Sequence, residues 1–252
     1  MAYRLGSIVL SLTVIRRLNW STNETPPATF GLLLGLFALY LLSCLVLDSF
    51  SNGEAWQRFL NGSSAPALNE LGANARFVTL DGREYWRLLT ATLLHGGFVH
   101  LLMNSFSLWN LGRQLEQSIG WQELLFAYVV TGLSSSLLSA LFGEPRVVSI
   151  GASGAIFGLL GFLISFGARD FFDLKDQISR NASIVLVALL LPAFIPNIDH
   201  WGHIGGVASG LVLGFCYRYP LQGVRQLLGI SSGVLLLAGA GMIVAQALRV
   251  GF

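Results

Sequence analysis

Charged residues are scarce in this sequence. Asp, Glu, Lys and Arg together make up 11% of its 252 residues, whereas soluble domains carry about 25%. Hydrophobic residues make up 54%, and the mean hydropathy is +0.66. The net charge is only +2, and no basic run stands out, so there is no electrostatic basis for binding nucleic acid. The composition excludes an ordinary soluble domain and predicts an integral membrane protein that lies in a lipid bilayer.

Cysteine is nearly absent as well. Cys44 and Cys216 are far apart in the chain, and each lies within an apolar stretch. Two isolated thiols provide neither a disulfide framework nor the paired spacing of a metal site. We therefore expect two core thiols, no bound metal and no cofactor.

Long uncharged windows take the place of the missing charges. A helix needs about 20 residues, within a range of about 17–25, to cross the hydrocarbon core. Seven windows between successive charged residues fit that range and predict seven transmembrane helices. These windows are 28–47, 88–112, 124–143, 147–168, 181–198, 200–217 and 226–248.

Two segments outside the windows have features of their own. Residues 1–27 hold an apolar run too short to span a bilayer, with no small-residue cleavage signal after it, and we expect them at the membrane interface. Residues 49–87 form a long loop that mixes apolar and aromatic residues with polar ones. We expect this loop to fold on to the outer membrane surface.

Basic residues predict the orientation. With a cytoplasmic N-terminus and alternating windows, four of the fifteen Lys and Arg residues fall in the loop 49–87, and only Arg146 and Arg249 fall elsewhere outside. Because basic residues favour the cytoplasmic side, the N-terminus is expected inside and the C-terminus outside. The nine basic residues on the cytoplasmic side are Arg4, Arg16, Arg17, Arg113, Arg169, Lys175, Arg180, Arg218 and Arg225.

Strongly polar side chains stand at or near the start of three windows, although such groups are costly inside a membrane. In the predicted topology the second, fourth and sixth helices run in the same direction, so these side chains share one depth near the outer surface. They are His95, His100 and Asn104 in HGGFVHLLMN, Ser153 in GASG, and His200 and His203 in DHWGHIGG.

Together these side chains are suited to nucleophilic catalysis. Ser153 opens a helix, where free backbone N–H groups favour a developing negative charge. His203 provides an imidazole base to take the serine proton. His100 and Asn104 are spaced i,i+4 on one helix face and, with the Ser153 amide, provide donors for an oxyanion. The chemistry requires no metal.

Glycines recur every four residues on two of these helices. Such stripes let helix backbones approach closely, which would bring Ser153 near His203. They serve contacts within one chain as readily as contacts between chains, so the oligomeric state stays open. The stripes are Gly154 and Gly158 on one helix and Gly202, Gly206, Gly210 and Gly214 on the other.

Other interpretations are available for each residue taken alone. A serine in a membrane helix is usually a packing residue or bonds a neighbouring helix. A lone intramembrane histidine is about as often structural as proton-carrying, and Asn104 alone would more often bond a neighbouring helix. A transporter or channel would need a polar path through the whole membrane, but the inner halves of these helices are apolar or small.

In combination, over about residues 30–220, the motifs resemble those of the rhomboid family of intramembrane serine proteases. GASG at 151–154 is similar to the family's G-x-S-G, and GHIGGVASG to its histidine followed by glycines. HGGFVHLLMN is similar to its H-x4-H-x3-N, YWRLLT to the Trp–Arg pair of its first loop, and LGRQLE to the motif that ends its second helix.

The resemblance implies an all-α polytopic bundle: a six-helix catalytic core over 28–220 and an additional transmembrane helix within 221–252. It implies a Ser153–His203 dyad without an acidic third member, although Asp199, four residues before His203, also invites a triad interpretation. It places His100, Asn104 and the Ser153 amide in the oxyanion hole. Residues of structural support would be His95, Trp86, Arg87, Glu116, Gly151, Gly154, Gly206 and Gly210.

The implied activity is endoproteolysis of single-span membrane proteins within or near their transmembrane segment. Substrates would approach sideways near the fifth window, where Pro192 and Pro196 weaken helical hydrogen bonding. We expect a bacterial plasma membrane, with the site open to the outer side. The alternative is a catalytically silent rhomboid-like protein that binds membrane clients.

Overall fold

The computed structural model describes residues 25–46, 55–145, 147–167, 179, 198–217 and 222–250. Throughout these residues the regular structure is helical, apart from one isolated β-bridge. The prediction of an all-α membrane protein is confirmed. The predicted interfacial segment 1–27 and the fifth window, 181–198, fall almost entirely outside the described residues.

Six long helices make up most of the described structure. Three of them are long and apolar enough to cross a membrane: α2, α7, and α12 over Gln226–Val250. The total of seven membrane-spanning helices stays a prediction. The long helices are α2 (Pro27–Val46), α6 (Phe98–Ile119), α7 (Trp121–Phe142), α8 (Ser153–Gly167), α11 (His200–Cys216) and α12 (Gln222–Val250).

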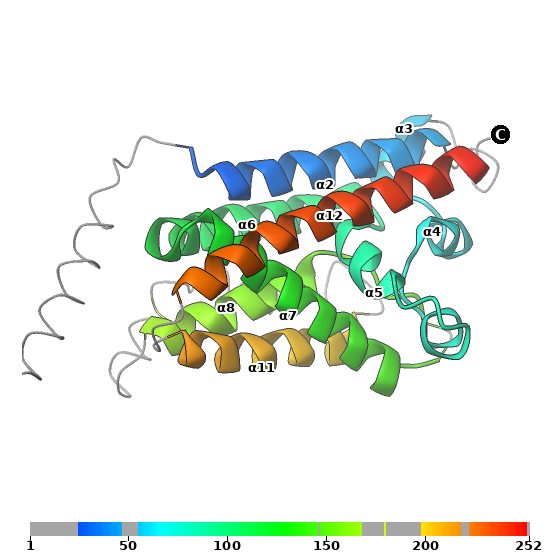
Figure 1. Cartoon of the computed structure of the whole chain (residues 1–252). Helices are drawn as coiled ribbons and strands as arrows, with labels where there is room; N and C mark the ends of the chain where they lie inside the picture. Colours follow the sequence, from blue (N-terminus) through cyan, green and yellow to red (C-terminus); the bar gives the residue numbers. More distant parts are fainter. Residues whose placement is uncertain are drawn as a thin grey trace, which may run out of the picture.

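Five short helical segments fill the region between α2 and α6. They build the long loop that the sequence indicates, and they lie beside one end of the bundle (Figure 1). These segments are α3 (Ala55–Asn61), α4 (Ala65–Leu71), the π-helix η2 (Phe77–Asp81), α5 (Arg87–Thr90) and the 3₁₀-helix η3 (Ala91–Leu93).

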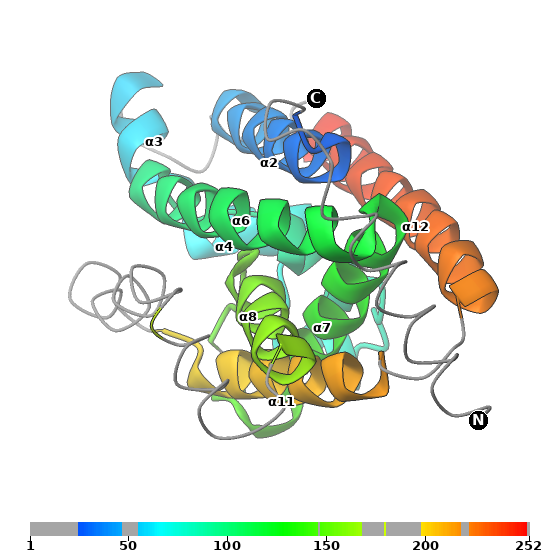
Figure 2. The same ribbon diagram turned by 90° about the vertical axis from the view of Figure 1, so that its left-hand side faces the viewer.

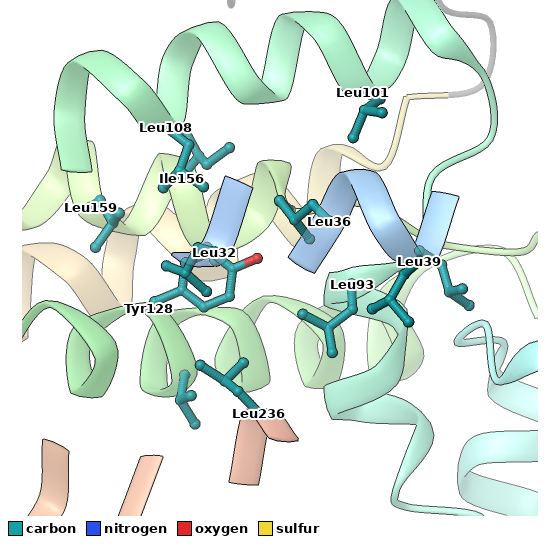
Figure 3. Close-up of a cluster of buried hydrophobic side chains, with 14 of the residues drawn as sticks. Leu32, Leu36, Leu39, Leu93, Leu101, Leu108, Tyr128, Ile156, Leu159 and Leu236 are labelled. Atoms are coloured by element: carbon teal, nitrogen blue, oxygen red, sulfur yellow. The ribbon is translucent and has the colours of Figure 1, made fainter. Parts of the chain in front are cut away.

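Helix α8 lies in the middle of the bundle. Figure 2 shows α6, α7 and α11 around it, while α2 and α12 lie side by side on the far side of α6 and α7 from α11. Leucines and a tyrosine from α2, α6, α7, α8 and α12 meet in the core (Figure 3). The central helix is therefore the one that begins at Ser153.

Helices α8 and α11 approach each other backbone to backbone. A Cβ added at Gly206 would lie 2.0 Å from the carbonyl oxygen of Gly154, and one at Gly210 would lie 1.9 Å from that of Gly158. No side chain fits at such separations. The glycine stripes of the two helices thus face each other and set the contact between them.

The expected bounds of the second membrane helix, 88–112, are wrong. The helix α6 begins at Phe98, ten residues later, and continues to Ile119. Leu94 is extended, with φ −87° and ψ 152°, and Gly96 and Gly97 follow it. At the other end, charge is a poor marker of the helix end, because both the half-buried Arg113 and the buried Glu116 lie inside the helix.

The expectation of two core thiols is half wrong. Cys44 is buried, whereas Cys216 is exposed on the last turn of α11. In a membrane helix an apolar side chain can face lipid as readily as protein, so an apolar window does not show which residues are buried.

Glu116 joins α6 to the beginning of α2. Its carboxylate accepts hydrogen bonds from the backbone N–H of Ala28 and of Thr29, both at 2.8 Å, and from the Thr29 hydroxyl at 2.7 Å. The first N–H groups of a helix have no partner within it. Because the side chain of Glu116 is fully buried, it serves as the cap of α2 from another helix.

We expect Glu116→Gln to destabilise the fold by about 1–3 kcal/mol. A glutamine offers one acceptor oxygen, and its NH₂ group would face the N–H of Ala28. The measurement is the thermal unfolding of the detergent-solubilised protein. Glu144→Gln, at an exposed position, is the matched control and should unfold like the wild type. Equal stability of all three proteins would contradict this role of Glu116.

Gly206→Ala should destabilise the protein by about 1–3 kcal/mol because its methyl group overlaps the carbonyl of Gly154. Gly35→Ala is the control: it lies on an exposed face of α2, with nothing within 4 Å of the added Cβ. The two variants are compared by unfolding in the same detergent. If Gly206→Ala unfolds no earlier than Gly35→Ala, close packing of α8 on α11 is not needed for stability.

Candidate active site

Ser153 is the first residue of α8, at the end of a tight turn. The preceding Gly151 has φ +117°, and a Cβ on it would lie 2.7 Å from the His100 ring. Both observations require glycine there. The N–H of Gly151 donates to the carbonyl of Ala91 at 2.9 Å, so this turn is fastened to the segment before α6.

His203 lies in the first turn of α11 and reaches across to Ser153. Its Nε2 is 3.0 Å from the Ser153 Oγ. The imidazole stacks on the Phe157 ring, with centroids 4.2 Å apart and an interplanar angle of 24°. The contact with the serine and the stack with Phe157 together fix the position and the plane of the ring.

His100 and Asn104 flank the turn before Ser153. Gly151 lies against both, since a Cβ on it would be 3.5 Å from Asn104 Nδ2 as well as near the His100 ring. Asn104 is buried, and its Nδ2 donates to His95 Nε2 at 3.0 Å. The rings of His95 and His100 pack edge to face, 5.1 Å apart. The structure thus places His100 and Asn104 against the turn before the serine, with His95 in contact with both.

Trp86, Arg87 and Glu116 lie away from the cleft beside Ser153. The Arg87 guanidinium donates to the carbonyls of Asn69 at 2.5 Å and Ala73 at 3.1 Å, and it stacks on the Trp86 ring at 4.8 Å. These contacts fasten the last turn of α4 and the residues just after it to α5. Glu116 acts at the opposite end of α6, where it caps α2.

Asp199 does not bond the His203 ring. Its Oδ1 accepts from the backbone N–H of Gly202 at 2.8 Å, as the N-cap of α11. Its Oδ2 accepts from the Ser149 hydroxyl at 2.5 Å. The Asp199 carboxylate thus makes hydrogen bonds to Gly202 and Ser149 and none to the imidazole of His203, so the geometry does not support a Ser–His–Asp triad.

A cleft of about 630 Å³ opens beside the serine and the histidine. Ligand pockets commonly have volumes of about 300–1,000 Å³. Its walls come from α3 and α4, from the turn before α6, from residues 148–150, and from the start of α11. The long loop between α2 and α6 therefore supplies part of the lining of the cleft.

A second, much smaller cavity of about 20 Å³ lies behind Ser153 and His203. Besides Ser153, three serines contribute to its lining, Ser135, Ser136 and Ser149, as does Asp199. A cavity needs about 10–15 Å³ to hold a water molecule, and the water needs two to four polar partners. This cavity has room and partners for one water.

Sequence reasoning missed two neighbours of the dyad, Phe157 and Ser149. Phe157 follows Ser153 by four residues, a spacing that puts both on one helix face. Ser149 precedes Ser153 by four, as Asp199 precedes His203. That repeated spacing of four residues is the sequence feature that could have identified Ser149.

No group of three or more His, Cys, Asp or Glu residues that could hold a metal ion occurs among the described residues.

Comparison with known proteins agrees with the motifs. The Rhomboid domain family model matches residues 82–220. RHOMBOID-like protein 5 of Arabidopsis thaliana is 38% identical over 173 residues, which cover 68% of this chain and 56% of that protein. Rhomboid protease GluP of Bacillus subtilis (strain 168) is 35% identical over 240 residues, covering 93% and 44%.

The relatives differ in activity and are longer than this chain. Inactive RHOMBOID-like protein 8 of Arabidopsis thaliana is 33% identical over 169 residues, which cover 66% of this chain and 48% of that protein. The chain spans about half the length of the curated relatives it matches.

Proposed function

Because the chain belongs to the rhomboid family, we propose that it is an intramembrane serine protease that cleaves single-span membrane proteins. The observation that carries the proposal is the 3.0 Å contact between Ser153 Oγ and His203 Nε2. This pair adjoins a cleft large enough for an unwound peptide segment. A serine needs a base within such reach to act as a nucleophile.

In the proposed reaction Ser153 Oγ attacks the carbonyl carbon of the scissile peptide bond while His203 Nε2 takes its proton. The carbonyl oxygen becomes an oxyanion, which accepts hydrogen bonds from the Ser153 N–H, His100 and Asn104. The contact between Asn104 and His95 holds the amide near its working position. His203 then gives its proton to the departing amine, and an acyl-enzyme remains.

Hydrolysis of the acyl-enzyme requires water inside a hydrophobic bundle. The cavity of about 20 Å³ behind the dyad has the size for one molecule. Water activated by His203 attacks the acyl carbon, and the proton returns through the imidazole to Ser153. Release of the new carboxylate completes the cycle without a cofactor or a metal.

Substrates are proposed to approach laterally, near the fifth window, whose residues Pro192 and Pro196 lie outside the described residues. A helical peptide bond is shielded by its own turns, so the substrate must unwind locally. Substrates with helix-breaking residues near the outer surface and a small residue before the scissile bond should therefore be preferred. Unwinding breaks backbone hydrogen bonds of the substrate helix, and this free-energy cost is offset by binding in the cleft.

The protein is an integral membrane protein, and its placement in a bacterial plasma membrane with a cytoplasmic N-terminus is part of the proposal. The excess of basic residues on one side of the predicted topology supports that orientation.

The second candidate function is that of a catalytically silent protein that binds membrane clients, since one relative is named inactive. Retention of both Ser153 and His203, in contact, favours the protease.

Purified wild type should cleave a single-span reporter that has small and helix-breaking residues near its outer end. Ser153→Ala and His203→Ala should each lose more than about 10³-fold in rate, because nucleophile and base act as a unit. Cleavage is followed by gel and mass spectrometry, in detergent and in lipid vesicles.

Ser134→Ala is the matched control, since the Ser134 hydroxyl bonds the carbonyl of Val130 in its own helix, and it should retain activity. Equal cleavage by all four proteins would indicate a contaminating protease. No cleavage by wild type across several reporters would favour the client-binding function instead.

A further inference from the structure

A second hydrogen-bonded pair repeats the spacing of the dyad. Ser149 lies four residues before Ser153, and Asp199 lies four residues before His203. The Ser149 hydroxyl donates to Asp199 Oδ2 at 2.5 Å, a length typical of a hydrogen bond from a hydroxyl to a carboxylate. Two contacts thus join the same two chain segments, each between residues 50 positions apart.

Ser149 is held firmly on its own side. Its backbone pairs with Asn74 in both directions, at 2.7 Å from the Ser149 N–H and 3.1 Å to its carbonyl. The Asn74 side chain in turn donates to the carbonyl of Ser136 in α7 at 2.8 Å. The hydroxyl of Ser149 is therefore presented from a point tied to the loop before α6 and to α7.

Asp199 transmits that fixed position to α11. Its other oxygen accepts from the N–H of Gly202, the residue next to His203. The carboxylate is thus bound at once to Ser149 and to the helix turn that carries the imidazole. A displacement of Asp199 relative to Ser149 would move the first turn of α11, and His203 with it.

Two groups of contacts hold α8 and α11 together around the dyad. On one side α8 and α11 are held by the glycine contacts at Gly154, Gly158, Gly206 and Gly210. Toward the cleft, the segments are joined by the dyad contact, by the stack of Phe157 on His203 and by the Ser149–Asp199 hydrogen bond. The Ser149–Asp199 bond therefore adds a link at the ends of α8 and α11 that line the cleft, where a substrate would enter.

We propose that Ser149 and Asp199 are positioning residues, whose hydrogen bond holds Ser153 and His203 at reacting distance while the cleft is occupied. The inference rests on the proposed protease activity. It assigns Asp199 a role through its bond to Ser149 rather than through its charge on the imidazole.

Four variants test separately the Ser149–Asp199 hydrogen bond, the charge of Asp199 and the capping of α11 by Asp199. Ser149→Ala removes the hydroxyl and keeps the backbone pairing with Asn74, whereas Ser149→Thr keeps a hydroxyl. Asp199→Ser keeps a capping oxygen for Gly202 but is too short to reach Ser149. Asp199→Asn keeps the cap and offers an amide that donates to the Ser149 oxygen, but carries no charge.

We expect Ser149→Ala and Asp199→Ser each to lower kcat by about 10- to 100-fold, the scale of a misplaced reacting group, with KM within about twofold. The rate of Ser153 labelling by a fluorophosphonate probe should fall in parallel. The double variant should lose no more than either single variant, because both remove the same bond. Ser149→Thr and Asp199→Asn should recover most of the activity.

Ser209→Ala is the matched control on α11: its hydroxyl bonds the carbonyls of Gly205 and Gly206 in its own helix. It should cleave and label like the wild type, and unfolding midpoints check that every variant is folded.

The proposal is overturned if Ser149→Ala keeps its kcat within twofold of wild type, or if the two single losses multiply in the double variant. It is also overturned if Asp199→Asn loses as much as Asp199→Ser, which would assign the effect to the charge. These failures are distinct from failure of the proposed function, in which the wild type neither cleaves the reporter nor labels at Ser153. That outcome would overturn both.

Discussion

The close approach of α8 to α11 is the constraint on which the rest of the structure depends. At Gly206 and Gly210 the carbonyl oxygens of α8 occupy the space of a side chain. Inside a bilayer, apolar burial adds little to helix association, and close van der Waals contact takes its place. With the two backbones in contact, side chains in their first turns can hydrogen-bond each other. The Ser153–His203 contact follows from that packing.

Buried polar groups act in this bundle as ties between segments. Glu116 joins α6 to the start of α2, and Arg87 joins α5 to the last turn of α4 and the residues just after it. Each would be costly to bury without its partners. Removing one partner of such a bond therefore lowers the folding stability by more than the net contribution of the bond, because the other buried group is left without a partner. The long loop between α2 and α6 is held in part by the bonds of Arg87, in addition to the backbone hydrogen bonds of its short helical segments.

The wall of the cleft combines fixed and open parts. Gly151 in its left-handed conformation ends an extended segment and lets α8 begin at the serine, with the first N–H groups of that helix unpaired within it. Asn74 and Ala91 fasten the same segment from outside. The groups proposed to react are thus preorganised, while the neighbouring cleft stays open to a substrate.

The sequence by itself determined the membrane class, because long gaps between charged residues report a preference for lipid. It also indicated the candidate site residues, because a serine or histidine inside such a gap is conspicuous. It predicted neither the start of α6 at Phe98 nor the exposure of Cys216, since an apolar window does not show what each face contacts. Glu116 lies inside a helix only because α2 supplies its donors. Only the tertiary structure decided that Asp199 Oδ2 bonds Ser149 rather than His203, because two segments 50 residues apart must pack before that oxygen meets the Ser149 hydroxyl.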